Sequence, residues 1–323
     1  MNIIVTGGLG MVGSNLVAYL SKTNRVFVID NNIRQMKDYS IAFIKEHGEF
    51  DNVTILVEDI REFDHTKLDR QIDIFFHLAD IVAGIGYVFD NQYEILTENM
   101  GIDRAAFELA KALEITKVVY ASTACVFNQY AQRSIDSKLK IDRDLFPAFP
   151  ESTYGWAKLY GQLLLQNLFE EQQYKVVFFH NMIGTPCDFF SDKSQMVPSL
   201  CNRLQNQSNN ELTVWGSGNQ GRAFVPVKTA AIFLSDLYNT WSDMGSLQQF
   251  GPGQCTSVNE VAEILITNFM QKCKIVHDLT KPEGDIGRSV DQADSIVEIS
   301  KEEVSSTIVE TYRWIAQQKL TTK

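Results

Sequence analysis

Several kinds of residue are scarce in this sequence, and each scarcity excludes a class of protein. The 323 residues include five cysteines, none of them in a CxxC pair or paired with histidine at metal-ligand spacing. Basic side chains are also few, because 29 lysines and arginines face 40 aspartates and glutamates and leave a net charge of -11. We therefore expect no metal site and no nucleic acid as a partner.

Long apolar runs are lacking as well. No stretch is long enough to span a bilayer, and residues 1–10 pass from methionine into a strand and a glycine-rich turn without the features of a secretory leader. We therefore expect a cytoplasmic protein with free thiols and no membrane partner. Repeats and low-complexity tracts are missing too, while 45% hydrophobic residues can form a large core.

The first half of the chain alternates short β-branched runs with longer helical patterns, which is typical of β-α-β units in a parallel sheet. The runs are almost continuously apolar, as strands covered on both faces require. The predicted strands are 2–6, 25–30, 53–58, 74–78, 117–122 and 175–180. The clearest helical periodicity covers 11–21, 99–113 and 154–171. The sequence therefore predicts an α/β fold with a doubly wound parallel sheet of the Rossmann type.

After residue 181 this alternation gives way to loops and shorter elements. Helices are expected at 197–205, 228–240, 258–272 and 301–319, and short strands near Thr213, near Phe224 and at 245–251. The helix and strand within 226–252 are expected to return to the sheet. We therefore expect an NAD-binding domain of residues 1–180 and 226–252, and a smaller discontinuous substrate-binding domain of residues 181–225 and 253–323.

A glycine-rich turn, TGGLGMVG, follows the first predicted strand. Its glycines Gly7, Gly10 and Gly13 allow backbone amides to approach a pyrophosphate at a helix N-terminus. Asp30 ends the second predicted strand, where a carboxylate accepts hydrogen bonds from both ribose hydroxyls and repels a 2′-phosphate. The pattern predicts NAD as the cofactor, with NADP kept as an alternative because Arg34 is near. A turn that only packs a helix on a strand is the other interpretation.

Further contacts with the cofactor are expected at the ends of neighbouring strands. Asp59 and Ile60 follow the third strand, where a carboxylate and an apolar side chain could bracket an adenine ring, although a solvated acidic loop is an equal alternative. His77 ends the fourth strand and is interpreted as a packed histidine without a chemical role. The residues that complete the expected cofactor site are Met11, Val12, Asp59, Ile60, Leu78 and Ala79.

Tyr154 and Lys158 are one helical turn apart, so a phenol and an ammonium share one helix face. A tyrosine with an ordinary pKa of about 10 is a poor base at neutral pH, but an adjacent cation and an oxidised nicotinamide would stabilise its phenolate. This chemistry suits oxidation of a hydroxyl group. Alone, the pair is more often ordinary helix surface, but here it follows a strand that ends in Ser122, Thr123 and Cys125 at the ligand-binding edge of the sheet.

Together these residues resemble the extended short-chain dehydrogenase/reductase family, the NAD-dependent epimerases and dehydratases of nucleotide sugars. The resemblance covers nearly the whole chain, through TGGLGMVG, HLAD, STACVF, YGWAK and later Asn181, Arg222 and Arg288. It implies tightly held NAD, a nucleotide-diphospho-sugar substrate and a homodimer formed through a four-helix bundle. It also implies that Thr123, Tyr154 and Lys158 remove a proton from a sugar hydroxyl while hydride passes to NAD.

Within this family, ASTACVF, ADIVAGIGYVF and FHN are most similar to the GDP-mannose 3,5-epimerases. The similarity implies a GDP-linked sugar and an acid/base role for Cys125 on carbons 3 and 5, whose protons a transient 4-ketone acidifies. A small buried hydrophobe is the alternative for Cys125. The family's second proton donor would be Lys193, although an ungapped alignment places Met196 there. Dehydratases carry Asp-Glu where this chain has Ala124 and Cys125, which disfavours simple loss of water.

Polar anchors for the substrate are also implied by the resemblance. Asn181, Arg222 and Arg288 match residues that hold the sugar and the diphosphate, and arginine binds phosphate bidentately. The leading hypothesis is an NAD-dependent enzyme that oxidises carbon 4 of a nucleotide-diphospho-sugar as part of an epimerase reaction. The alternatives are a 4-dehydrogenase or 4-epimerase without the thiol step, and a catalytically silent NAD-binding sensor or scaffold.

Overall fold

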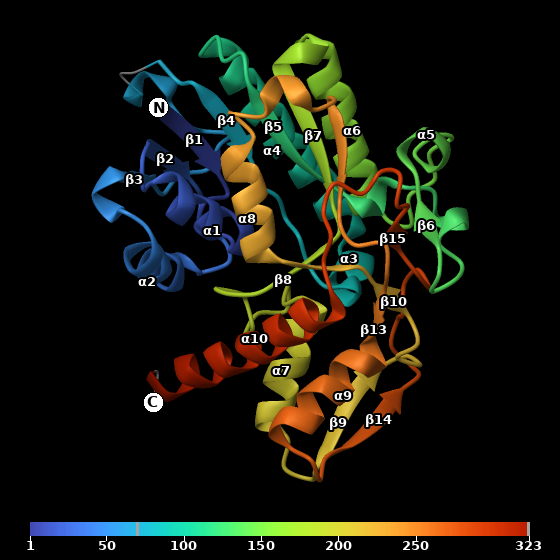
Figure 1. Cartoon of the computed structure of the whole chain (residues 1–323). Coiled ribbons are helices and arrows are strands. Elements are labelled where there is room, and N and C mark those ends of the chain that lie inside the picture. Colours follow the sequence, from blue (N-terminus) through green and yellow to red (C-terminus); the bar gives the residue numbers. More distant parts are fainter. Residues whose placement is uncertain (69–70, 322–323) are drawn as a thin grey trace.

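A seven-stranded parallel sheet forms the centre of the computed structural model (Figure 1), which describes residues 1–68 and 71–321. The strand order is β12-β7-β5-β4-β1-β2-β3. The strands are β1 (Asn2–Thr6), β2 (Arg25–Ile29), β3 (Val53–Leu56), β4 (Ile74–His77), β5 (Val118–Thr123), β7 (Tyr174–Phe179) and β12 (Leu247–Phe250). The order reverses between β1 and β4, and the carboxyl ends of such strands border the ligand crevice of doubly wound sheets. The predicted fold class is confirmed.

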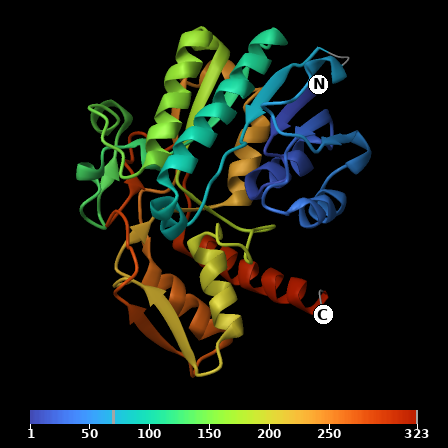
Figure 2. The ribbon, with the colours of Figure 1, turned by 180° about the vertical axis from the view of Figure 1, so that it is seen from behind.

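Helices cover both faces of the sheet (Figure 2). On one face α4 (Gln92–Ala112) and α6 (Thr153–Leu168) lie side by side, and on the other α1 (Met11–Leu20) packs against α2 (Lys37–His47) and α8 (Val227–Asp236). Successive residues of β1 enter the two cores alternately, Ile3 and Val5 in one and Ile4 in the other, all fully buried. Burial on both faces explains why the strands are apolar throughout.

A smaller group of elements lies beyond the carboxyl ends of the strands (Figure 1). Two parallel strand pairs belong to it, β8 (Asn181–Ile183) with β11 (Phe224–Pro226) and β9 (Glu211–Trp215) with β14 (Lys274–Asp278). Its helices are α7 (Met196–Asn206), α9 (Val258–Phe269) and α10 (Lys301–Thr321), which contact one another. The remaining short elements are α3 (Ile85–Asp90), β6 (Lys138–Leu139), α5 (Ile141–Asp144), β10 (Gly221–Arg222), β13 (Thr256–Ser257) and β15 (Ser289–Val290).

The predicted strands and long helices are present with shifted ends, and several elements were not predicted. Helix α4 begins at Gln92, ahead of predicted residue 99, while α6 ends at Leu168, ahead of predicted residue 171. The longest missed helix is α2 and the longest missed strand is β14; the shorter elements α3, α5, β6, β8, β10, β13 and β15 were missed as well. Helix α2 buries only Ser40 and Ile44, and β14 is a largely exposed strand of a two-stranded sheet. Neither has the apolar periodicity that a buried element shows.

A buried polar network joins β1, β4, β5 and α4. His77 Nε2 lies 2.9 Å from Asp103 Oδ1, and the hydroxyl of Tyr120 donates to Asp103 Oδ2 at 2.6 Å. The other ring nitrogen of His77 lies 2.7 Å from Thr6 Oγ1, and all four residues are fully buried. Gly161 of α6 makes room for this network, because a Cβ atom there would lie 2.1 Å from Asp103 Oδ2. The network therefore determines how closely α6 can approach α4 and β5.

Replacing Gly161 with alanine should lower the free energy of unfolding by about 1–3 kcal/mol, because the added methyl group forces Asp103 and Tyr120 away from α6. Urea unfolding followed by circular dichroism measures this effect. Gly101→Ala is the matched control, since Gly101 also lies inside a helix and its nearest Cβ neighbour is Arg61 Cδ at 3.6 Å. The control should be neutral or stabilising by up to about 1 kcal/mol. Equal effects of the two changes would contradict the packing role of Gly161.

Candidate functional site

A cleft of about 670 Å³ lies at the carboxyl ends of the central strands. Its walls come from the sheet and from the smaller group of elements, so it joins the two parts of the molecule. Nearly all the residues predicted for the site line it. They are Gly7, Gly10, Met11, Val12, Gly13, Asp30, Asp59, Ile60, Leu78, Ala79, Thr123, Cys125, Tyr154, Lys158, Asn181, Arg222 and Arg288.

The glycine turn after β1 forms a cradle that only glycine permits. Gly7 has a φ of +69°, and a Cβ atom there would lie 2.7 Å from the backbone nitrogen of Ala79. A Cβ atom on Gly13 would lie 2.1 Å from the carbonyl oxygen of Gly7. Gly10 precedes α1 and supplies no capping side chain, so the first amides of the helix are available to an anion. This cradle fits the pyrophosphate of a dinucleotide.

Asp30 is held by the same turn. Its two carboxylate oxygens accept backbone hydrogen bonds from Leu9 at 2.9 Å and Asn32 at 2.8 Å, and burial raises the pKa of the carboxyl. The remaining lone pairs can accept hydrogen bonds from ribose hydroxyls. Arg34 faces Asp188 across the cleft, with Nη1 3.6 Å from Oδ2. Because a carboxylate already accompanies this guanidinium, the arrangement suits NAD better than a 2′-phosphorylated cofactor.

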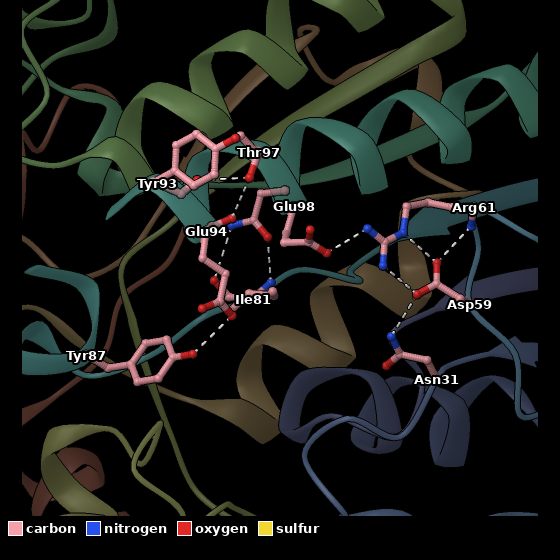
Figure 3. Close-up of polar contacts among 10 residues, drawn as sticks. Asn31, Asp59, Arg61, Ile81, Tyr87, Tyr93, Glu94, Thr97 and Glu98 are labelled. Atoms are coloured by element: carbon pink, nitrogen blue, oxygen red, sulfur yellow. Dashed lines mark hydrogen bonds and ion pairs between the residues drawn. The ribbon is translucent and has the colours of Figure 1, made fainter. Parts of the chain in front are cut away.

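Arg61 connects the end of β3 to α4 (Figure 3). Its Nε and Nη2 each donate to Asp59 at 2.8 Å, and its Nη1 donates to Glu98 at 2.6 Å. The hydrogen bonds from Arg61 lower the pKa of Asp59, which also accepts a bond of 3.1 Å from Asn31. Asp59 is therefore a fixed carboxylate at the mouth of the expected adenine region, and the adjacent Ile60 supplies an apolar surface in the same cleft.

Hydroxyl, thiol, phenol and ammonium groups meet where α6 begins beside the end of β5. Thr123 ends β5 and its Oγ1 accepts a hydrogen bond of 3.2 Å from the backbone nitrogen of Cys125. Tyr154 and Lys158 lie on the first turns of α6 and line the same cleft. Gly155 allows this approach, since a Cβ atom there would lie 2.2 Å from the carbonyl oxygen of Cys125.

Lys158 forms a buried ion pair that the sequence did not predict. Its Nζ lies 2.7 Å from Asp80 Oδ2, and the two side chains are 3% and 2% exposed. Burial raises the pKa of Tyr154 well above its ordinary value, and the charge of Asp80 raises it further. Lys158 alone therefore does not ionise the phenol in this arrangement, because Asp80 balances its charge. In the sequence Asp80 is only the last residue of HLAD, and no local pattern connects it to a residue so far along the chain.

Arg288 links the thiol of Cys125 to two carboxylates. Its Nη1 lies 2.7 Å from Cys125 Sγ, while its Nη2 lies 2.6 Å from Asp285 Oδ2 and 3.4 Å from Glu151 Oε2. Arg222 donates from Nη1 to the carbonyl oxygen of Asp285 at 2.7 Å. Burial raises the pKa of Asp285 to about 6. The sequence did not predict Glu151 or Asp285 as site residues, since neither lies in a recognisable sequence motif.

Lys193, expected as a second proton donor, does not line the cleft. Its Nζ lies 4.3 Å from the ring centroid of Tyr87 and 3.7 Å from Asp192 Oδ1. Met196, the alternative from the ungapped alignment, begins α7 and does line the cleft. A thioether cannot donate a proton. Lys193 therefore packs on the ring of Tyr87, a residue that lines the cleft, and its role as the second proton donor stays a prediction.

All five cysteines are free thiols, of which Cys187, Cys201 and Cys273 are buried. Cys125 is partly exposed and is the one on which the proposed chemistry depends. Within residues 1–68 and 71–321, no group of three or more histidine, cysteine, aspartate or glutamate side chains could hold a metal ion. No helix in the same ranges is long and apolar enough to cross a membrane.

The doubly wound sheet, the glycine cradle and the tyrosine–lysine pair define a dinucleotide-dependent enzyme of the extended short-chain dehydrogenase/reductase type. The model of the NAD dependent epimerase/dehydratase family matches residues 3–235, and the chain belongs to this family. NAD is its cofactor.

Known relatives agree with this assignment. The chain is 26% identical over 294 residues to GDP-mannose 3,5-epimerase 1 of Oryza sativa subsp. indica, covering 90% of this chain and 74% of the relative. A solved NAD-dependent NDP-hexosamine 5,6-dehydratase involved in tunicamycin biosynthesis has a TM-score of 0.78 at 24% identity, covering 98% of each chain. UDP-glucuronic acid 4-epimerase from Bacillus cereus has a TM-score of 0.81 at 19% identity, covering 98% of this chain and 100% of that one. The two structures share the fold.

Replacing Asp80 with asparagine should remove the charge that balances Lys158 and lower the pKa of Tyr154. The acid limb of the pH–rate profile should then move to lower pH by about one unit, because the loss of a neighbouring negative charge favours the ionised phenol. Reduction of NAD by a nucleotide sugar, followed at several pH values, measures the shift. The control is Asp136→Asn, which changes an exposed carboxylate. An Asp80→Asn profile that coincides with the control would show that Asp80 does not act on Tyr154.

Proposed function

We propose that this enzyme oxidises carbon 4 of a GDP-linked sugar as one step of an epimerase reaction. The observation that carries the proposal is the meeting of Thr123, Tyr154 and Lys158 in the cleft that also contains the glycine cradle. The GDP linkage is inferred from relatives named GDP-mannose 3,5-epimerase and GDP-L-colitose synthase, the latter from Yersinia pseudotuberculosis and 23% identical over 297 residues.

In this proposal three residues have separate roles in the first step, the oxidation of the sugar hydroxyl. Thr123 orients the oxygen of the reacting hydroxyl, and Tyr154 accepts its proton. Lys158 donates hydrogen bonds to the cofactor ribose and stabilises the phenolate. When bound, oxidised NAD supplies a hydride acceptor and a positive charge beside the phenol. That added charge matters here, because Asp80 already balances the charge of Lys158.

The second step is proposed for Cys125. A ketone at carbon 4 acidifies the protons on carbons 3 and 5, so a thiolate can remove such a proton and the thiol can return it. Arg288 places a cation 2.7 Å from the sulfur, where it meets the negative charge of the thiolate form. Inversion of configuration at carbon 3 or carbon 5 distinguishes this route from simple oxidation of carbon 4.

The smaller part of the molecule is proposed to bind the substrate. Residues 181–225 and 253–323 would form this domain, with residues 1–180 and 226–252 as the NAD-binding domain. Asn181 would contact the sugar, and Arg222 and Arg288 would hold the diphosphate, because all three line the same cleft.

One observation favours a second candidate. The ammonium of Lys193 packs on the ring of Tyr87 and lies 3.7 Å from Asp192 Oδ1, and Met196, the alternative for the second proton donor, has no proton to donate. A 4-epimerase or 4-dehydrogenase needs only Thr123, Tyr154 and Lys158. The UDP-glucuronic acid 4-epimerase from Bacillus cereus has the same fold.

Replacing Tyr154 with phenylalanine removes the proposed proton acceptor and leaves the ring in place. Reduction of NAD by GDP- or UDP-sugars, followed at the NADH absorbance, should fall by a factor of about 100 or more. Binding of NAD should persist, because the glycine cradle is unchanged. Tyr130→Phe is the control, since Tyr130 is 57% exposed and lies outside the lining of the cleft. Full turnover by the Tyr154→Phe variant would remove the tyrosine from the mechanism.

Replacing Cys125 with alanine tests the thiol step separately. The variant should still reduce NAD, but it should no longer introduce deuterium from heavy water at carbon 3 or carbon 5 of the sugar. Nuclear magnetic resonance of the recovered sugar locates the label. Cys255→Ala, a partly exposed cysteine outside the lining of the cleft, is the control and should exchange normally. If exchange survives in Cys125→Ala, the thiol is structural and the second candidate is favoured.

We also propose a homodimer formed through α4 and α6. These helices carry Tyr93, Trp156 and Leu163, which are 82%, 41% and 44% exposed, and exposed apolar side chains on adjacent helices are typical of subunit contacts. Light scattering should give the mass of two chains, and Leu163→Glu should give the mass of one. Ile232→Glu on α8, 48% exposed, should remain dimeric. A wild-type protein with the mass of one chain would contradict the proposal.

A further inference from the structure

Two carboxylates lie against Arg288, one of the two arginines to which the diphosphate is proposed to bind. Glu151 precedes α6 and Asp285 precedes Arg288, and their side chains are 14% and 8% exposed. Both approach the guanidinium of Arg288, while Arg222 contacts the backbone of Asp285. The charges of two arginines and two acids therefore cancel within the protein. A diphosphate that binds here meets two negative charges together with the two positive ones.

The packing around the cluster leaves little room for the carboxylates to move away. Gly284 has a φ of +71°, and a Cβ atom there would lie 3.1 Å from Glu151 Oε1 and 3.2 Å from Arg222 Nη2. Arg288 has a 4% exposed side chain, and its Nε is buried without a hydrogen-bond partner in the described part of the chain. The cluster is thus a tight polar site with one donor still unused.

An anion in this site raises the free energy of the ionised carboxylates. Like charges a few ångströms apart in a partly buried site repel strongly, and protonation of one carboxyl relieves the repulsion. Burial already raises the pKa of Asp285 to about 6, and the neighbouring charge of Glu151 raises it further, against the opposing charges of Arg288 and Arg222. A proton on Asp285, beside the carboxylate of Glu151, is therefore accessible near neutral pH.

We propose that Glu151 and Asp285 together take up one proton when a nucleoside diphosphate binds to Arg222 and Arg288. The proton comes from solvent and no covalent bond to the ligand forms. The inference rests on the proposed function, because it assigns the diphosphate to these arginines. The two acids then determine how the affinity for a diphosphate varies with pH. They oppose the anion while both are ionised, and they tolerate it once one of them is protonated.

The coupling between diphosphate binding and proton uptake determines whether the affinity rises or falls with pH. Below the Asp285 pKa of about 6 that carboxyl already holds its proton, so binding takes up little and the affinity is nearly constant. Above that pH the proton must be acquired on binding, so the affinity should fall by up to about tenfold for each pH unit. The Cys125 thiol faces the same guanidinium, so the same measurement on Cys125→Ala separates the contribution of the thiol from that of the two acids.

The test is isothermal titration calorimetry of the NAD-saturated enzyme with GDP and with UDP at pH 7.5, in two buffers that differ in ionisation enthalpy. The difference in heat between the buffers gives the number of protons taken up, and the expected number is close to one. Asp285→Asn should take up almost none, and its affinity should vary little between pH 6 and pH 8. Glu298→Gln changes an exposed acid and is the control.

Glu151→Gln provides a second variant in case Asp285→Asn folds poorly, which a thermal melt would reveal. Binding by the wild type without proton uptake overturns the inference and leaves the proposed function intact. The same holds if both variants take up as many protons as the wild type. Failure of GDP and UDP to bind at any pH overturns the inference together with the diphosphate site of the proposed function.

Discussion

The site depends on the close approach of α6 to β5. Gly155 and Gly161 permit it, because a Cβ atom at either position would clash with the backbone of Cys125 or with the side chains of Asp103 and Tyr120. This packing places the phenol and ammonium of α6 beside the hydroxyl and thiol that lie at the end of β5. Since the strands on both sides are fully buried, the edge of the sheet is rigid and these groups have little freedom to separate.

Charge balance is the second property that shapes the cleft. Asp80 accompanies Lys158, and Glu151 and Asp285 accompany Arg288, so two of the cations expected to act on a ligand already have carboxylate partners. Buried ion pairs contribute little to stability because desolvation offsets their attraction. Their placement in a ligand cleft therefore points to control of ligand binding and of proton affinity, as functional sites commonly show.

The family assignment and the geometry agree on an NAD-dependent enzyme with a glycine cradle and a tyrosine–lysine pair in one cleft. In the proposed reaction the fate of the oxidised sugar depends on Cys125 with Arg288, whereas the second candidate function needs no thiol step.

By itself the sequence was sufficient for the sheet, the glycine turn, Asp30 and the spacing of Tyr154 and Lys158, because each depends on apolar runs or on residues close together in the chain. Helix α2 and strand β14 escaped prediction since they bury few side chains. Only the tertiary structure brought Asp80 to Lys158 and Glu151 to Arg288. Those pairs are far apart in the chain, and their charges meet because folding places separate loops at one edge of the sheet, which no local pattern records.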